Sequence, residues 1–185
     1  MLAQQGFERT HPALAQALDY LRREQEPDGS WFGRWGTNYV YGTWSVLCAL
    51  NAAGEDADAP HVRKAVAWLM SRQQADGGWG ESCASYWHGR RQETAPSTPS
   101  QTAWALLGLM AAGESESTAV ARGIAYLIAA PRQGARWDEE LYNAVGFPRV
   151  FYLRYHGYSA YFPLWALARY RNLMRQNDRR VACGM

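Results

Sequence analysis

The sequence has few cysteines, little net charge and no long apolar run. The three cysteines, Cys48, Cys83 and Cys183, share no close spacing, and an odd number argues against a framework of disulfides. No stretch approaches about 18 consecutive apolar residues, so we expect no membrane-spanning helix, although contact with a membrane surface needs only a patch. The 19 Lys and Arg residues nearly balance 17 Asp and Glu residues, which does not indicate a nucleic-acid partner.

Several functional signatures are also missing. Residues 1–11 lack a basic start followed by an apolar stretch, so we expect no secretory leader and a cytoplasmic location. The sequence contains no Ser-His-Asp nucleophile motif, no phosphate loop and no dinucleotide fingerprint. Its four histidines have no ligand spacing, and we predict neither a metal nor a cofactor.

Aromatic residues, by contrast, are abundant, at 14% of 185 residues with 9 Trp and 11 Tyr. Three of the tryptophans, Trp31, Trp79 and Trp137, mark an internal repeat. Apolar residues precede each of them at i, i+4 and i+7, the spacing of one face of an amphipathic helix. In two copies a glutamine (Gln25 or Gln73) and an Asp-Gly turn follow the helix, whereas the third copy keeps only its tryptophan.

We expect these residues to be structural. The tryptophans would pack over the helix ends while each indole N–H finds a partner, and the two glutamines would satisfy nearby backbone groups. Three other tryptophans, Trp44, Trp104 and Trp165, are expected to pack between inner helices.

A second kind of segment alternates with the first. Residues 43–55 and 102–114 are apolar nearly all round and carry Ala-Ala-Gly just before their last residue, and residues 162–170 are related to them. Helices apolar all round are buried, and helices with one apolar stripe cover them. The pattern predicts an all-α fold, an incomplete α/α barrel (toroid) of alternating outer and inner helices, over residues 1–174, with a polar tail at 175–185. We predict no strand, since 38–41 is too short.

The second repeat carries a specific motif, made of Lys64-Ala65, Trp68-Leu69, Gln73 and Gly77-Gly78-Trp79. It resembles the QW motif of triterpene cyclases. The segments 28–36, 97–104 and 146–156 narrow the resemblance to the C-terminal part of squalene–hopene cyclases, over roughly residues 12–173.

The resemblance implies part of a class II cyclase, which protonates squalene and folds the polyene through a series of carbocations. Such enzymes have two α-barrel domains around a large apolar cavity, and this chain resembles about half of the second barrel. Aromatic faces suit such a cavity because they stabilise a cation without offering a nucleophile, each worth ~0.5–2 kcal/mol.

The resemblance also implies six site residues. Trp35 matches a tryptophan of the cavity wall, and Phe147 and Phe151 match a pair that stabilises cations. Tyr155 and Tyr158 match two further cavity tyrosines, and Tyr41 matches a tyrosine that supports the catalytic acid. From composition alone we would assign the tryptophan and the phenylalanines to the core, and the tyrosines are evenly balanced between core and site. Protein prenyltransferases share the barrel and bind zinc, but Cys83 has no Asp partner with a downstream His.

One part of the family pattern is missing, namely the Asp-x-Asp-Asp motif that protonates the terminal alkene. The nearest string, Asp56-Ala57-Asp58, falls in a polar loop between helices, so we do not expect it to be catalytic. In the family, the acid motif, its histidine partner and the other barrel lie upstream of the stretch that begins here. The resemblance therefore implies half a cavity without a proton source, inactive by itself.

Two hypotheses follow. In the first, the chain is the C-terminal portion of a squalene–hopene-type cyclase, whose partners are squalene or a similar polyprenoid and the missing N-terminal part. The complete enzyme would then be cytoplasmic or in peripheral contact with a membrane. In the second, it is a non-catalytic α/α-repeat module or a partner subunit, as the missing acid and Met1 just ahead of the first repeat suggest. In both we expect no nucleic acid and a tendency to self-associate.

Overall fold

The computed structural model describes residues 2–176, which form six α-helices, two short 3-10 helices and two small sheets. The α-helices are α1 (Pro12–Arg23), α2 (Tyr39–Ala52), α3 (Pro60–Ser71), α4 (Pro99–Ala111), α5 (Thr118–Ala129) and α6 (Tyr158–Gln176). The shorter elements are η1 (Ala3–Gln5), η2 (Cys83–Tyr86), β1 (Arg132–Gln133), β2 (Arg136–Trp137), β3 (Ala144–Phe147) and β4 (Phe151–Leu153). Helix α6 continues to Gln176, while Cys183 and the remainder of the expected polar tail lie outside the described residues.

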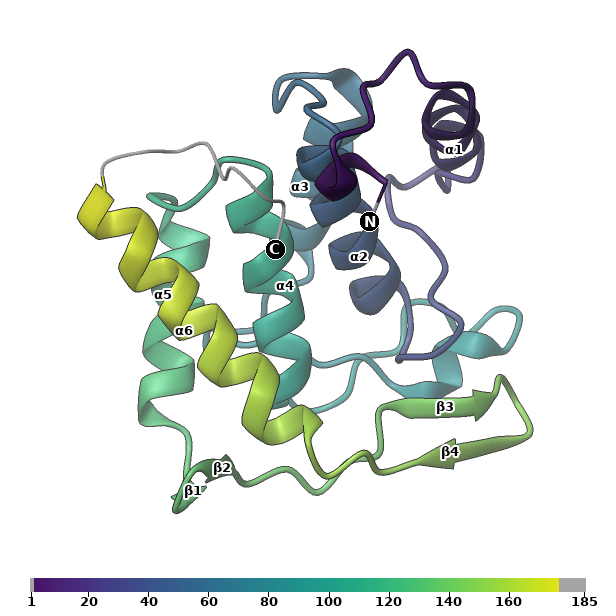
Figure 1. Ribbon diagram of the computed structural model, residues 1–185. Helices are drawn as coiled ribbons and strands as arrows, with labels where there is room; N and C mark the ends of the chain where they lie inside the picture. Colours follow the sequence, from purple (N-terminus) through teal and green to yellow (C-terminus); the bar gives the residue numbers. More distant parts are fainter. Residues whose placement is uncertain (1, 177–185) are drawn as a thin grey trace.

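Helices α2, α4 and α6 form an inner row, and α1, α3 and α5 lie outside it (Figure 1). Helix α4 is central, since it packs against α2 on one side and α6 on the other, and α5 covers it. Every residue of α4 is buried, as the all-round apolar pattern predicted. The outer helices bury one stripe each, such as Val62, Val66 and Leu69 of α3. The structure is therefore mostly helical, although not all-α as predicted.

The ends of the helices follow from local sequence. Pro12, Pro60 and Pro99 occupy the first helical positions of α1, α3 and α4, where the missing N–H costs nothing. The Ala-Ala-Gly segments end α2 and α4, and Gly54 and Gly113 adopt φ of +70° and +85°, a conformation that glycine reaches without strain.

The repeat tryptophans fasten each outer helix to the turn that follows it. The indole Nε1 of Trp31, Trp79 and Trp137 donates to the carbonyl ten residues earlier, on Leu21, Leu69 and Leu127, at 2.7, 2.8 and 2.8 Å. Each bond joins the indole to a carbonyl near the C-terminal end of the preceding helix, and the Leu69 carbonyl also accepts from the Arg72 N–H at 3.1 Å.

The two repeat glutamines join one outer helix to the next. Gln25 Nε2 donates to the carbonyls of Gly29 and His61, at 2.9 and 2.8 Å, and His61 lies at the start of α3. Gln73 Nε2 makes the same pair of bonds, to Gly77 at 2.9 Å and to Ala119 of α5 at 2.8 Å. The first two repeats therefore share the same hydrogen bonds as well as a similar sequence.

The prediction that the chain has no strand is wrong. β3 and β4 pair antiparallel with an irregularity between Val145 and Phe147, and their connection turns at Arg149, whose φ is +67°. A second small sheet pairs β1 with β2 around Gly134. These strands are two to four residues long, so they show no alternation of polar and apolar residues over a length that identifies a strand.

Within residues 2–176, no helix is long and apolar enough to cross a membrane.

Cys48 and Cys83 are free thiols, and burial raises the pKa of Cys48 to about 12.

Candidate functional site

The six predicted site residues lie at one end of the inner row, where α2 and α6 begin. Tyr41 is in the first turn of α2, Trp35 is in the segment before it, and Tyr158 opens α6. The β3–β4 hairpin, which carries both phenylalanines, runs along this end of the molecule (Figure 1).

Two of the tyrosines meet on one buried indole. Ring centroids of Tyr41 and Trp104 are 4.9 Å apart, those of Tyr158 and Trp104 are 5.5 Å apart, and both pairs are edge-to-face. Tyr155 adds to this group through Tyr158, at 5.2 Å. Burial, with the neighbouring phenols of Tyr41 and Tyr155, raises the pKa of Tyr158 to about 12, and burial raises the pKa of Tyr41. Both side chains therefore stay neutral hydrogen-bond donors at physiological pH.

The phenylalanine pair sits on the hairpin and faces outward. Phe147 and Phe151 are 52% and 43% exposed, and their rings meet edge-to-face at 5.7 Å. Phe151 also lies over Gly146, where an added Cβ would come within 2.0 Å of its ring, so a side chain at this position would displace the ring. The main chain thus fixes Phe151 while its outer face remains open.

Trp35 approaches the hairpin through its backbone. Its carbonyl accepts from the N–H of Val145 at 3.1 Å, and Gly36 forms an isolated bridge with Ala144. The indole itself is 52% exposed. The structure therefore brings the Trp35 segment beside β3, but among residues 2–176 no ring contact joins Trp35 or the phenylalanine pair to the tyrosine group.

Two glutamates that sequence reasoning missed hold the inner helices at this end. The Glu81 carboxylate, which is buried, accepts from the N–H groups of Asn38, Tyr39 and Val40 at 3.1, 3.0 and 2.9 Å, where α2 begins. A carboxylate at a helix N-terminus satisfies unpaired donors and complements the helix dipole.

Glu139 does the same for α4. Its carboxylate accepts from the backbone N–H and the hydroxyl of Ser100, both at 2.9 Å, and from Asn143 at 2.8 Å. Burial raises the pKa of Glu139 against the effect of these bonds and of Arg154. Both glutamates stand two residues after a repeat tryptophan, a signal present in the sequence that the repeat pattern alone did not reveal.

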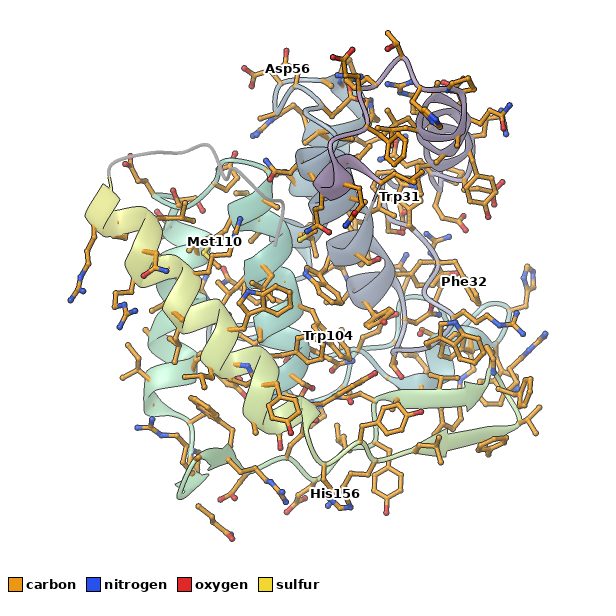
Figure 2. The ribbon with its side chains drawn as sticks, viewed as in Figure 1. Trp31, Phe32, Asp56, Trp104, Met110 and His156 are labelled. Carbon is orange, nitrogen blue, oxygen red and sulfur yellow. The ribbon has the colours of Figure 1, made fainter. Side chains whose placement is uncertain are left out.

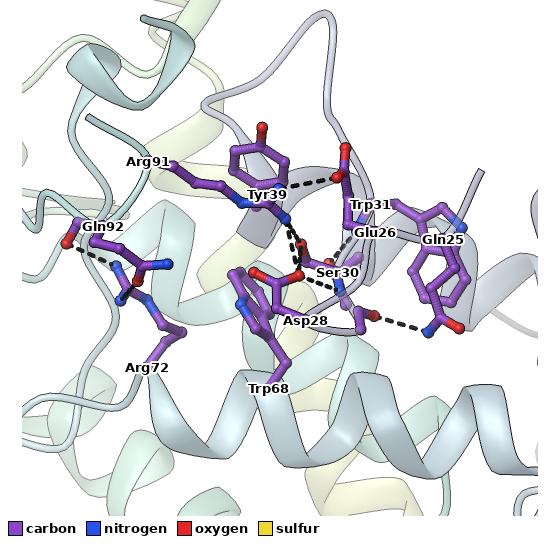
Figure 3. A network of polar contacts seen from close by, with 12 residues as sticks. Gln25, Glu26, Asp28, Ser30, Trp31, Tyr39, Trp68, Arg72, Arg91 and Gln92 are labelled. Carbon is purple, nitrogen blue, oxygen red and sulfur yellow. Dashed lines mark hydrogen bonds and ion pairs between the residues drawn. The ribbon is translucent and has the colours of Figure 1, made fainter. Parts of the chain in front are cut away.

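A surface network fastens the first repeat turn to the chain that follows η2 (Figure 3). Arg91 pairs with Glu26 at 2.9 Å and with Asp28 at 2.8 Å, and its guanidinium lies 3.9 Å from the centre of the Tyr39 ring. Because Tyr39 is the first residue of α2, the network supports the same end of that helix from outside.

The aspartates nearest to an acid motif lie elsewhere. Asp56 and Asp58 are exposed, and the Asp58 N–H donates to the Asp56 carboxylate at 3.0 Å, an ordinary turn contact. Figure 2 shows Asp56 at the opposite end of the helices from His156, which follows Tyr155. Among the described residues no group of three His, Cys, Asp or Glu side chains is placed to hold a metal ion.

Two hollows in the described part of the chain, of about 410 and 520 Å³, are lined by residues other than the predicted wall, the larger by Phe32, Tyr39 and Trp87 among others. The exposed faces of Trp35, Phe147 and Phe151 accordingly form an open aromatic surface.

Comparison with known proteins gives a consistent result. A model of the squalene-hopene cyclase C-terminal domain matches residues 1–172. The probable squalene–hopene cyclase of Sinorhizobium fredii is 64% identical over 181 residues, and the squalene–hopene cyclase of Bradyrhizobium diazoefficiens is 61% identical over 187. These alignments cover 96% and 100% of this chain but 28% of each relative, so the chain spans about a quarter of their length.

Solved structures of a type II terpene cyclase from Scytonema have a similar fold. The unliganded form has a TM-score of 0.62 at 21% identity, covering 88% of this chain and 52% of that one. A variant in complex with its substrate, geranylgeranyl dihydroxybenzoate, has a TM-score of 0.55 at 27% identity, covering 75% of this chain and 37% of that one.

Proposed function

The chain belongs to the squalene-hopene cyclase C-terminal domain family, and from that premise we propose that it supplies part of the cavity wall of a class II triterpene cyclase. In that enzyme it forms about half of the C-terminal α/α barrel, and the cavity cyclises squalene or a similar polyprenoid to pentacyclic hopanoids. The proposal places the complete enzyme in the cytoplasm, in peripheral contact with a membrane.

The observation that carries the proposal is the aromatic surface at the start of the inner helices. Phe147 and Phe151 form an edge-to-face pair that remains about half exposed, although phenylalanines of a finished core are buried. Half-exposed rings, held by a hairpin, Gly146 and a neighbouring backbone segment, are suited to face a ligand that the rest of a barrel encloses.

The chemistry explains why the wall is aromatic. Protonation of the terminal alkene forms a carbon–hydrogen bond and leaves a tertiary cation, which each following double bond attacks to close a ring. Water would capture this cation, whereas an aromatic face stabilises it by ~0.5–2 kcal/mol without forming a bond. We assign Phe147 and Phe151 to a late cation, and Trp35, Tyr155 and Tyr158 to the surrounding wall.

The proton comes from outside the described residues. Tyr41 would donate its phenol hydrogen bond to the catalytic acid, a role that its raised pKa and half-buried position support. Because no Asp-x-Asp-Asp motif occurs in this sequence, the proposal includes that the chain alone makes no cyclic product.

The test is a chimera in which this chain replaces the matching segment of the Bradyrhizobium diazoefficiens enzyme, called the chimera below. We expect pentacyclic product from squalene by mass spectrometry, and none from the 185-residue chain alone. A folded chimera without product would contradict the cavity-wall assignment, and product from the chain alone would contradict the missing acid.

A second candidate is a partner subunit that completes a cavity with another chain, and the absent acid motif favours it. It predicts that separately expressed chains, this one and a polypeptide carrying the upstream part, form a stable complex that cyclises squalene. If the two copurify only when fused, the single-chain interpretation stands.

A further inference from the structure

We propose that Trp104 is a positioning residue of the cyclase cavity, which holds the rings of Tyr41 and Tyr158 in their working orientation. This inference rests on the proposed function, because it concerns the same wall. It adds a buried indole to a set of residues that the proposal otherwise places against the ligand or, for Tyr41, beside the catalytic acid.

The geometry singles out Trp104 among the rings of the described chain. It lies in the middle of α4 (Figure 2). It is 0% exposed and is the one ring in residues 2–176 that contacts both Tyr41 and Tyr158. The interplanar angles are 80° and 82°, so both contacts are edge-to-face, the arrangement that the charge distribution of aromatic rings favours. One rigid indole therefore sets the position of two phenols that come from different helices.

Both tyrosines have a second neighbour that restricts them further. An added Cβ at Gly36 would lie 2.3 Å from the Tyr41 ring, so this ring rests directly on the main chain. Tyr158 packs edge-to-face on Phe162 at 5.2 Å, and Phe162 in turn contacts Trp104 at 5.5 Å. Trp104 therefore closes one side of each ring, and a smaller side chain at this position would leave a gap beside both.

The indole N–H of Trp104 indicates that packing alone does not explain the residue. Nε1 is buried without a hydrogen-bond acceptor among the described residues. A buried donor without a partner is costly, and phenylalanine at this position would remove the cost. Tryptophan is therefore useful here for its larger ring, which reaches Tyr41 and Tyr158 together.

The chain offers a matched control in Trp165. It belongs to the same aromatic cluster, through Trp44 at 6.4 Å and Phe162 at 6.2 Å, but it contacts neither tyrosine. Replacing Trp165 by Phe removes the same amount of indole from the cluster while leaving both tyrosine contacts in place.

The first experiment measures products of the chimera carrying Trp104→Leu, Trp104→Phe or Trp165→Phe. Losing one aromatic pair should shift the ratio of partly cyclised to pentacyclic product about twofold to tenfold. We expect that shift for Trp104→Leu, a smaller shift for Trp104→Phe, and an unchanged ratio for Trp165→Phe. If the Trp104 variants lower only the melting temperature and keep the product ratio, Trp104 is a core residue and the inference is wrong.

The second experiment reads the rings directly and does not depend on activity. 3-Fluorotyrosine placed at position 41 or 158 of the chimera reports its surroundings by ¹⁹F NMR. Trp104→Leu should move or broaden both resonances, and Trp165→Phe should leave both unchanged. Unchanged resonances in folded Trp104→Leu or Trp104→Phe would overturn the inference, whereas an inactive wild-type chimera whose resonances respond would contradict the proposed function alone.

Discussion

At the scale of single residues, tryptophan has two distinct uses in this chain. The repeat tryptophans Trp31, Trp79 and Trp137 are buried, and each donates to the end of its own helix. Trp35 is half exposed beside the hairpin and donates no such bond among the contacts of residues 2–176. In the sequence, the repeat interval marks the first kind, whereas Trp35 is distinguished by the resemblance of segment 28–36 to the cyclase family.

Trp31→Ala in the chimera should reduce stability and leave chemistry intact. Trp31 is 3% exposed, and the substitution removes both its buried side chain and the hydrogen bond that its indole donates to the Leu21 carbonyl. Large-to-small changes of this kind cost about 3–5 kcal/mol of stability. The melting temperature, followed by circular dichroism, should fall, and the product profile of the surviving enzyme should match the parent. An altered profile at unchanged stability would mean that Trp31 contacts the substrate.

Phe151→Ala in the chimera should change the products and leave the stability nearly unchanged. Its ring is 43% exposed, so its loss removes little packing, but it takes away ~0.5–2 kcal/mol of cation stabilisation. Deprotonation then competes with the next ring closure, and partly cyclised products should accumulate in the mass spectrum with little change in melting temperature. If the variant unfolds while its products stay the same, Phe151 belongs to the core and the site assignment is wrong.

At the scale of elements, the sequence predicts the helices well and their connections poorly. The apolar periodicity, the Asp-Gly turns and the glycine ends predict outer and inner helices, and all three features reappear in the structure as positive φ angles and buried stripes. The β3–β4 hairpin could not be predicted in the same way, because its partner segment, Trp35 to Gly36, lies more than a hundred residues earlier. Contacts of that separation leave no periodic trace in the strands themselves.

The helix-capping glutamates could be predicted from the sequence only in part. Trp79-Gly80-Glu81 and Trp137-Asp138-Glu139 share a spacing that is visible in the sequence, but the first copy has Gly33 in that place. Only the structure reveals the reason for the spacing. Each glutamate caps the inner helix of the preceding repeat, so the acid of one repeat stabilises the neighbouring one.

Glu139 should make the stability of the chimera depend on pH. Its folded pKa is raised by burial, so its contribution is fully present below the unfolded pKa of about 4.3 and is lost as pH rises through the folded pKa. Glu139→Gln cannot titrate, and the melting temperature of the parent should therefore fall relative to this variant as the pH is raised from about 4 toward neutrality.

Glu93→Gln is the control for that series. Glu93 pairs with Arg90 on the surface, and its hydrogen bond to Arg90 lowers its pKa, so its contribution is present above the unfolded pKa and lost as pH falls. The difference in melting temperature between the parent and Glu93→Gln should therefore change with pH in the direction opposite to that for Glu139→Gln. A Glu139→Gln difference that is constant across the series would show that the carboxylate keeps an ordinary pKa in the folded protein.

At the scale of the whole molecule, the inner row formed by the described residues is open on one side. α4 is enclosed by α2, α6 and α5, but α6 leaves large apolar side chains in solvent, among them Tyr161 at 73% and Leu164 at 61% exposure. These two residues are three apart and share a face of α6, so they extend the same helix surface outward. In repeat architectures each unit depends on its neighbours to cover its core, and a terminal inner helix without one is left uncovered.

The isolated chain should therefore self-associate through the outer face of α6. Leu164→Lys and Tyr161→Lys place two like charges on this face without touching the buried side of the helix, because both positions are more than half exposed. By sedimentation velocity we expect the parent chain to form oligomers or aggregates and the double variant to move toward monomer, since burying unpaired charge opposes association. Ile128→Lys on α5 is the control, an equally exposed apolar position outside α6. A parent chain that sediments as a monodisperse monomer, or an Ile128→Lys variant that dissociates as fully as the α6 variant, would show that the open side of the row does not drive assembly.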